Sequence, residues 1–381
     1  MTSSAAKEGW AREYTWGAIC LCVLIGILIA GLWPFSPFPR NGVRWLTSEN
    51  GLRFGPDGIV VSSTDFQWAG SSGTGPCSLE IWLRPDKNNG SRDILTLHSL
   101  ENPQRLRLFQ WAGSTLLLYK DWGTQHREID INNVLHPGVS LFITITGGPQ
   151  HTSVYVNGRL AGTSRRLALS RSDLGGQLIL GTSPLADSAW AGDVYGIAVY
   201  GTELTATQVT RHFDAWRGGE YPAIEADEMP VALYAFSERQ GRVVHNEMGA
   251  GPDLTIPERF LIPHKTLLLA PWKDIRWNRN STEDAVINVA GFVPFGFSVC
   301  AYLSLKSKRA TALTIAGGAT LSLTIEILQV FLPRRTSSLA DVMMNVLGVA
   351  LGILLCKSWV TKHWLAERPN ERCPGSLTRK R

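Results

Sequence analysis

The chain has 381 residues and a net charge of +5, from 37 Lys and Arg against 32 Asp and Glu. Its basic excess lies in loops and in the tail beside apolar runs, which indicates membrane topology and argues against a nucleic-acid-binding surface. Of six cysteines only Cys77 lies in the polar middle of the chain, so that region cannot form an internal disulfide, and no zinc-ligand or Cys-x-x-Cys spacing is present.

The first apolar run extends from Thr15 to Trp33, close to the roughly 20 residues that cross a hydrocarbon core. A cleaved signal peptide is the alternative, because such peptides also place an apolar run near the N-terminus. No small-x-small cleavage site follows, as the chain reads Ile29-Ala30-Gly31-Leu32-Trp33-Pro34. We therefore predict an uncleaved transmembrane helix over 15–33, preceded by a cytoplasmic N-terminus over 1–14.

The middle of the chain, residues 51–253, alternates short β-rich runs with turn signals, which is typical of a β-sandwich or jelly roll. Asn157-Gly158 is the strongest hairpin signal, because both turn positions favour positive φ. Leu204–Trp216 is predicted to be a helix that Thr205 and Gln208 cap. Strands are predicted at Ser78–Leu83, Leu116–Tyr119, Leu141–Thr146, Ser153–Val156, Gln177–Leu180, Asp193–Tyr200 and Val231–Phe236.

Three segments carry a resemblance to laminin G-type, concanavalin A-like domains: Trp190–Tyr200 with Leu204-Thr205, Tyr155-Val156-Asn157-Gly158, and Val231–Phe236 with Gly241. The resemblance implies a jelly-roll sandwich of a kind that often binds glycans or proteins, sometimes with calcium. Asp193 is the candidate calcium ligand, and no other cofactor is expected. Trp82, Trp111, Trp122 and Trp190 offer rings for sugar stacking, with core and edge packing as the alternative.

Some sandwich glycan hydrolases use a Glu-x-Asp-x-x-Glu strand, whose two glutamates serve as nucleophile and acid/base. This chain has Glu128 and Asp130, but Asn133 stands where the second glutamate belongs. An amide cannot deliver a proton, so hydrolysis by this strand is not expected.

Three further apolar runs follow within residues 285–359, after a segment over 254–284 that is predicted to lie at the membrane surface. A buried hairpin of a soluble protein is the alternative, but three runs joined by short charged links favour membrane spans. The predicted spans are Ala285–Leu305, Ala310–Leu332 and Leu339–Trp359. The expected fold is thus an all-β sandwich together with a transmembrane bundle of about four α-helices.

Basic residues set the predicted orientation. They cluster between the second and third spans and in the tail over 360–381, which places both on the cytoplasmic side. Four spans then put the sandwich outside the cytoplasm. Arg334 and Arg335 would also lie outside, so they require a partner there.

Polar side chains inside membrane spans are costly and usually functional. In the predicted topology they gather in the outer third of the bundle, and Arg335 is a natural partner for Glu326 or Asp341. Either acid is a candidate catalytic group, and the others are candidate ligand-binding groups; helix capping and interhelix hydrogen bonding are the alternative. The set is Asn288, Glu326, Gln329, Arg335, Ser338, Asp341 and Asn345.

This set resembles the VanZ-like family in the order Asn288 with Phe292–Phe297, then Glu326–Arg335, then Ser338, Asp341, Asn345 and Gly348. Leu32-Trp33-Pro34-Phe35 is similar to the family's first span, so the sandwich lies as an insertion after it. The resemblance implies a multi-pass protein of the bacterial cytoplasmic membrane, and the family's named member is associated with low-level teicoplanin resistance. Many members carry Asp-Lys-x-x-His at the second span, where this chain has Asn288.

Three functions remain open. The chain is an envelope protein that binds a wall glycan, lipid-linked precursor or glycopeptide, or an intramembrane enzyme or carrier for a lipid-linked substrate, or a scaffold that binds another protein. The absence of an acid pair in the sandwich favours binding over catalysis. The expected partners are the lipid bilayer and such an envelope ligand, not nucleic acid.

Overall fold

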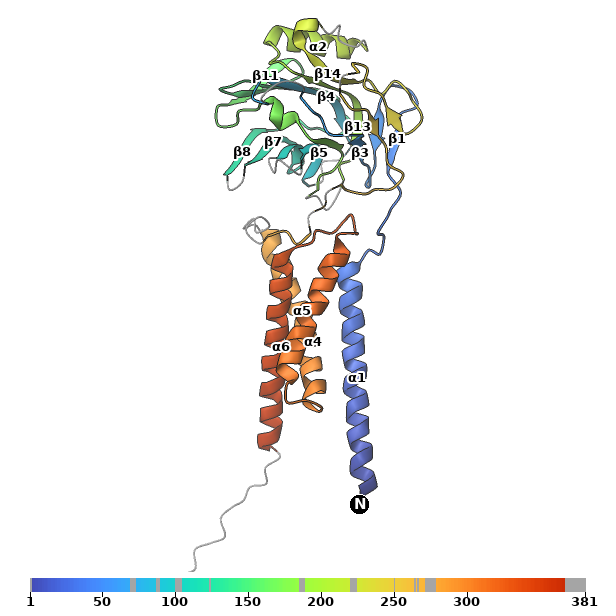
Figure 1. Ribbon diagram of the computed structural model, residues 1–381, viewed down its shortest axis with the longest axis vertical. Coiled ribbons are helices and arrows are strands. Elements are labelled where there is room, and N and C mark those ends of the chain that lie inside the picture. The colour runs from blue at the N-terminus through green and yellow to red at the C-terminus, as the bar shows by residue number, and fades with distance from the viewer. Residues whose placement is uncertain are drawn as a thin grey trace, which may run out of the picture. The chain divides into compact units, whose positions relative to one another are not determined.

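The computed structural model describes residues 2–68, 73–86, 90–99, 105–122, 125–184, 189–219, 225–249, 251–263, 265, 267–270 and 279–366. These residues divide into two units (Figure 1). The helical unit comprises Met1–Phe35, Leu267–Leu332 and Thr336–Arg381, and the sandwich unit comprises Ser36–Thr266 with Pro333–Arg335.

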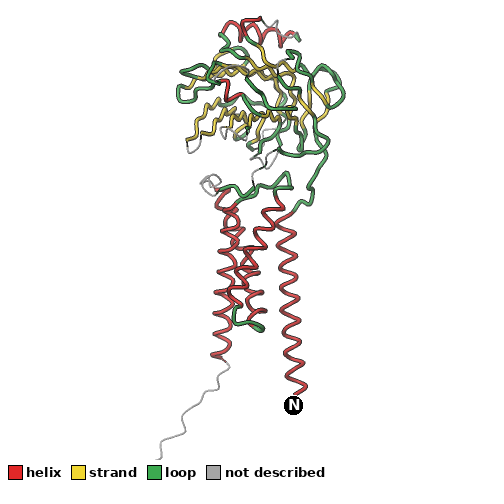
Figure 2. Tube along the Cα trace, in the orientation of Figure 1, coloured by secondary structure: helices red, strands yellow, loops and turns green. Residues whose placement is uncertain are grey.

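The sandwich unit consists of two sheets, and the pairings between the strands named below are all antiparallel. Figure 2 draws these strands in yellow. In the first sheet the order is β1-β2-β13-β4-β9-β10-β11, with β14 also paired to β13. Its strands are β1 (Val43–Trp45), β2 (Leu52–Phe54), β4 (Cys77–Pro85), β9 (Leu141–Gly147), β10 (Thr152–Val156), β11 (Arg159–Ser164), β13 (Gly192–Tyr200) and β14 (Pro230–Tyr234).

The second sheet has the order β15-β16-β3-β12-β5-β6-β7-β8. Its strands are β3 (Val60–Ser62), β5 (Arg92–His98), β6 (Arg105–Trp111), β7 (Thr115–Trp122), β8 (Gln125–Ile131), β12 (Gln177–Leu180), β15 (Val243–Val244) and β16 (Leu254–Thr255). Two 3₁₀ turns, η1 (Arg171–Leu174) and η2 (Ala226–Glu228), lie in the connections. The predicted sandwich is confirmed, and with β1 and β16 it is wider at both ends than residues 51–253.

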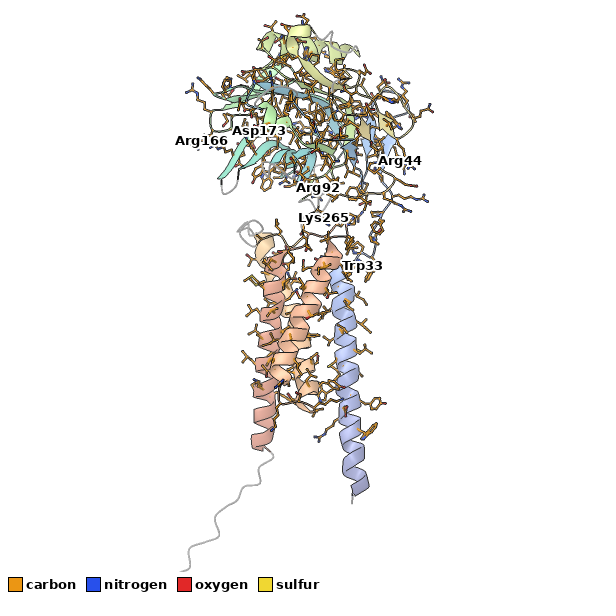
Figure 3. All side chains as sticks on the ribbon, in the orientation of Figure 1. Trp33, Arg44, Arg92, Arg166, Asp173 and Lys265 are labelled. Atoms are coloured by element: carbon orange, nitrogen blue, oxygen red, sulfur yellow. The ribbon has the colours of Figure 1, made fainter. Side chains whose placement is uncertain are left out.

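Alternation along the strands divides the side chains between two layers of packing. Leu79, Ile81 and Leu83 of β4 point into the main core between the sheets, whereas Glu80 and Trp82 point to the outer face of the first sheet. The predicted hairpin is present, with φ of 51° at Asn157 and 75° at the following glycine. Buried ion pairs also occur inside the sandwich, such as Lys120 with Asp173 at 2.7 Å (Figure 3).

Helix α2 (Ala206–Gly218) covers the outer face of the first sheet. Thr205 caps its start, since the Thr205 hydroxyl accepts from Gln208 N and the Gln208 side chain accepts from Thr205 N, as predicted. Its apolar face packs on a second cluster that includes Phe142, Tyr200 and Trp216.

The helical unit contains α1 (Thr2–Leu32), α4 (Arg279–Ser304), α5 (Ala310–Gln329) and α6 (Leu339–Ala366). Among the described residues these four helices are long and apolar enough to span a membrane. Helices α4 and α6 approach most closely at glycines: a Cβ at Gly348 would lie 2.2 Å from Val289 O, and one at Gly352 would lie 2.2 Å from Val293 O. Only residues without a side chain allow such a backbone approach. Trp16 of α1 packs on Phe297 of α4 and Trp359 of α6, with ring centroids 6.0 and 6.3 Å apart.

Candidate functional sites

The polar residues of the helical unit meet in pairs where α5 ends and α6 begins. Asn288 Nδ2 of α4 donates to Asp341 Oδ1 of α6 over 2.7 Å. Asn345 Nδ2 of α6 donates to Ser322 Oγ of α5 over 2.9 Å. These bonds join three helices at neighbouring levels, so the structure brings together residues that the sequence placed on separate spans.

Among the described residues of the helical unit, Glu326 is the most deeply buried acid, with 2% of its surface exposed. Its Oε2 accepts the backbone N–H of Ser338 over 2.8 Å, and Ser338 Oγ accepts from Ala340 N over 3.1 Å. Both contacts satisfy backbone donors at the start of α6, where the helix dipole also favours a carboxylate. Glu326 therefore has a structural role in capping α6, which does not require it to take part in a reaction.

Gln329 lies three residues after Glu326 in α5, and it too is buried. Its Nε2 donates to Gly31 O of α1 over 2.8 Å, which fixes the end of α1 against α5. A side chain from the third span thus holds the first one, a contact that the sequence order could not indicate.

Asn345 has one buried oxygen without a hydrogen-bond donor among the described residues, its Oδ1, although only 5% of the residue is exposed. A buried amide oxygen normally has a partner, because leaving it unpaired costs about 1–3 kcal/mol.

The two arginines predicted to lie outside the cytoplasm, Arg334 and Arg335, group with the sandwich unit. Within that unit Arg334 forms an ion pair with Asp57, its terminal nitrogen lying 2.9 Å from Asp57 Oδ2. The pairing of Arg335 with Glu326 or Asp341 stays a prediction.

In the sandwich, Asp193 lies between two guanidinium groups. Arg53 Nε is 2.7 Å from Asp193 Oδ1, and an Arg84 terminal nitrogen is 2.6 Å from Oδ2. Burial alone would raise the pKa of Asp193, but the hydrogen bonds from Arg53 and Arg84 outweigh it and lower that pKa. A calcium ion at Asp193 would have to displace both positive groups, and the described residues contain no cluster of three or more His, Cys, Asp or Glu suited to a metal.

The tryptophans singled out from the sequence differ in their surroundings. Trp190 is a core residue whose Nε1 donates to Gln110 Oε1 over 3.0 Å. Trp111 is 41% exposed on β6, and the side chain of Trp122 lies outside the described residues. Trp82 lines a pocket on the outer face of the first sheet.

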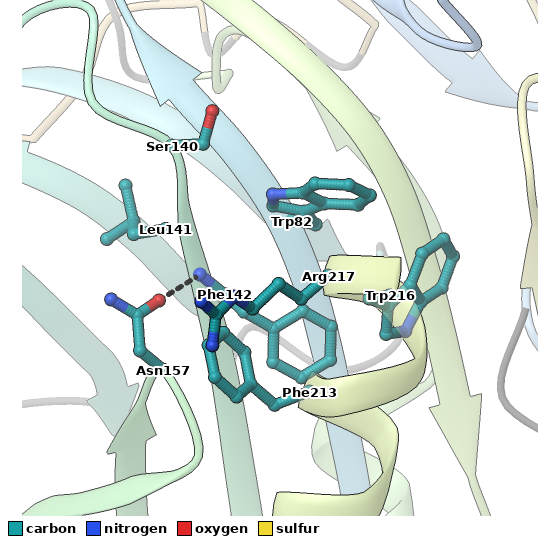
Figure 4. Close-up of a pocket in the computed structure, with 8 residues that line it drawn as sticks. All are labelled: Trp82, Ser140, Leu141, Phe142, Asn157, Phe213, Trp216 and Arg217. Atoms are coloured by element: carbon teal, nitrogen blue, oxygen red, sulfur yellow. Dashed lines mark hydrogen bonds between the residues drawn. The ribbon is translucent and has the colours of Figure 1, made fainter. Parts of the chain in front are cut away.

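This pocket has a volume of about 200 Å³ (Figure 4). Four segments form it: strand β4, the start of β9, the hairpin between β10 and β11, and the last two turns of α2. Figure 4 shows the rings of Trp82 and Trp216 on one side and Asn157 on the other. The lining residues are Trp82, Ser140, Leu141, Phe142, Asn157, Phe213, Trp216 and Arg217.

A buried charged network fixes α2, and with it the helical side of the pocket. His212 Nδ1 lies 3.1 Å from Glu80 Oε2, and His212 Nε2 lies 3.2 Å from Glu228 Oε1. Tyr200 donates to Glu80 over 2.8 Å, and Arg211 pairs with Glu228. Burial would lower the pKa of His212, but the bond and charge of Glu80 and the charge of Glu228 raise it above its usual value. Arg211 also pairs with Glu225, so this guanidinium is shared between two carboxylates.

Comparison with known families matches both units. A VanZ/LLP1 model matches residues 231–361, which include β14 and α4–α6, and a model of the concanavalin A-like lectin/glucanase superfamily matches residues 57–210. The chain joins a VanZ-like domain to a laminin G-type domain. Both predicted resemblances are confirmed. A search of curated proteins finds no match.

Similar solved structures include a Bacteroides ovatus protein assigned to carbohydrate binding, at 13% identity and a TM-score of 0.39, which covers 55% of this chain and 60% of that one. A heptameric pentraxin from Limulus polyphemus has 11% identity and a TM-score of 0.35, covering 56% and 93%. The sialidase carbohydrate-binding domain of Ruminococcus gnavus has 12% identity and a TM-score of 0.33, covering 42% and 95%. At identities and TM-scores this low, the likeness assigns no ligand to this chain.

Proposed function

We propose that this chain is a multi-pass protein of the bacterial cytoplasmic membrane whose laminin G-type sandwich, outside the cytoplasm, binds an envelope carbohydrate. The observation that carries the proposal is the pocket beside Trp82. It combines aromatic faces, which bind the apolar face of a sugar ring, with side-chain donors that reach hydroxyl groups. The VanZ-like helices hold the sandwich at the membrane, where wall glycan and lipid-linked precursors are presented.

Binding of wall fragments to the full chain in detergent tests the proposal. Tryptophan fluorescence is followed during titration with soluble peptidoglycan fragments, teichoic acid fragments and teicoplanin. The variant Trp82→Leu should weaken binding at least tenfold, whereas Trp111→Leu, on the other sheet, should leave it within about twofold of the parent. Failure of the parent chain to bind any of these ligands would refute carbohydrate binding.

In the cell, binding of an envelope ligand by this protein should contribute to tolerance of glycopeptide antibiotics. A deletion strain should become more sensitive to teicoplanin or to other envelope antibiotics, and the parent gene should restore tolerance. Complementation with Trp82→Leu then asks whether tolerance requires the pocket, provided that the variant reaches the parent protein level.

A second function, action on a lipid-linked substrate within the membrane, is favoured by the polar cluster of the helical unit. Glu326 and Asp341 are its acid/base groups, Asn345 offers a buried acceptor, and Arg335 would hold an anionic headgroup. Glu326→Gln separates this function from helix capping. The glutamine keeps an oxygen that accepts the Ser338 N–H but carries no charge and no titratable proton.

If Glu326 acts chemically, Glu326→Gln should abolish the phenotype at an unchanged protein level, and Arg335→Ala should do the same. If Glu326 only caps α6, the glutamine variant should complement fully. Loss of the protein itself would indicate a structural role.

A further inference from the structure

The positive charge of Arg217 at the pocket favours an acidic sugar over a neutral one. Arg217 is the one charged residue among the eight described residues that line the pocket, and none of those eight is acidic. Arg217 is exposed at the end of α2, and within the described part of the chain no ion pair to its guanidinium is found. A positive group at the mouth of an aromatic pocket favours an anionic ligand, since an Arg fork and a carboxylate form two parallel charge-assisted hydrogen bonds.

The aromatic walls are held in place before a ligand arrives. The ring centroids of Trp82 and Trp216 are 5.8 Å apart, those of Phe142 and Phe213 are 6.1 Å apart, and Trp82 also packs on Tyr195 at 5.0 Å. Rings that support each other in this way lose little freedom when a ligand stacks on them. The pocket therefore presents a preorganised apolar surface next to a cation.

Asn157 supplies an oriented amide on the opposite side. Its backbone N–H donates to Phe142 O over 2.7 Å, and its Oδ1 accepts from Phe142 N over 2.9 Å. With the carbonyl oxygen occupied, the NH₂ group is the part of this exposed side chain that serves as a hydrogen-bond donor. Hydroxyl and carboxylate oxygens are the complementary acceptors.

The size of the pocket limits the ligand to a single ring. At about 200 Å³, the volume lies below the roughly 300–1,000 Å³ of sites that enclose drug-sized molecules. One pyranose ring with its substituents suits this volume, and an oligosaccharide would have to extend out of the pocket.

We propose that the pocket selects a carboxylated sugar ring, with Trp82 and Phe213 against the apolar face, Asn157 as donor, and Arg217 bound to the carboxylate. This inference rests on the proposed carbohydrate-binding function and specifies its ligand class. Arg217 is thus the specificity-determining residue, because the aromatic walls would accept neutral and acidic rings alike.

Glucuronic acid and glucose form the matched ligand pair, because they differ only in a carboxylate in place of a hydroxymethyl group. The full chain in neutral detergent is titrated with each sugar, and tryptophan fluorescence is recorded. We expect glucuronate to bind at least tenfold more tightly than glucose, as one charge-assisted bidentate pair would give. The difference should shrink as salt is added, because the ion pair is partly exposed.

The variant Arg217→Gln should bring the two dissociation constants within about threefold of each other, chiefly by weakening glucuronate binding. Arg166→Gln is the control, since Arg166 is an exposed arginine of the same unit outside the pocket (Figure 3). It should retain the full preference for glucuronate.

Equal binding of the two sugars by the parent chain, or a preference that survives Arg217→Gln, would overturn the acidic-sugar inference and leave carbohydrate binding intact. A tighter affinity for glucose 6-phosphate than for glucuronate would also overturn it, since the carboxylate would then not be the selected group. If neither sugar nor any wall fragment binds, both this inference and the proposed function fail together.

Discussion

The charge balance around His212 is directly testable by replacing this residue with leucine. The imidazolium lies between Glu80 and Glu228, and both carboxylates are buried, each with 0% of the residue exposed. Leucine is similar in volume but offers neither charge nor hydrogen bonds. The variant would leave two buried carboxylates with Arg211 as their one neighbouring cation.

Removing one partner from a buried ionic network costs about 3–5 kcal/mol, because a charge is left without compensation in a poorly solvated site. The sandwich unit includes Ser36–Thr266, and for a domain of about 150–250 residues 1 kcal/mol shifts the melting temperature by about 2–4 °C. His212→Leu should therefore lower the melting temperature of the sandwich by about 6–20 °C. Adding Glu228→Gln to this variant removes the excess negative charge and should recover part of the loss.

Far-UV circular dichroism of the full chain in detergent measures this effect, since loss of the β-sheet signal reports the sandwich. His136→Gln is the control, because His136 is exposed in a loop and a surface substitution changes stability by about 0.5 kcal/mol or less. A His212→Leu variant that melts with the parent would show that the network carries no net charge stabilisation, and the reasoning would be wrong.

Three further outcomes are expected. The folded-state pKa of His212 is raised, so the stabilisation it provides is full below the unfolded pKa of about 6.5 and is lost as pH rises through the folded-state pKa. The melting temperature of the sandwich should therefore decline on the alkaline side of this range. The His212→Leu variant should lack this decline. Gly352→Leu should separate α4 from α6 and reduce the yield of folded protein in detergent, whereas Gly317→Leu, where a Cβ would meet nothing within 4 Å, should keep the parent yield. Asp193→Asn should destabilise the sandwich by about 1–3 kcal/mol, and calcium should not raise the parent melting temperature, since Arg53 and Arg84 occupy this carboxylate; a calcium-dependent rise would contradict that assignment.

Local patterns in the sequence were sufficient for the fold class and for the more strongly patterned elements, whereas strands such as β1, β3, β5 and β6 were not predicted. The Asn157-Gly158 turn, the Thr205 capping box and the four apolar runs each depend on residues close together in the chain, and the structure contains all of them. Both family resemblances also followed from ordered local motifs. The polar set around Glu326 could be found in the same way, because an ionisable residue within an apolar run is conspicuous in the sequence.

The pocket and its charge could not be predicted from the sequence. Trp82 was recognised as a possible stacking residue, but nothing in its surroundings distinguished it from Trp190, which is in the core. Asn157 was interpreted only as a turn residue, and Arg217 was not noticed. Phe213 and Trp216 lie on a predicted helix, but the sequence does not show which sheet that helix covers, so their place in the pocket could not be predicted.

By itself the sequence determined which secondary-structure elements form. The spacing of apolar residues distinguishes a strand from a helix, and the length of an apolar run determines whether a helix can span a membrane. Only the tertiary structure decided which polar groups meet. Asp341 bonds to Asn288 across 53 positions of the chain, and Gln329 reaches Gly31 across 298. Such pairs depend on how whole elements pack, because the free energy of burying a polar group is set by the partner that packing brings to it, not by its neighbours in sequence.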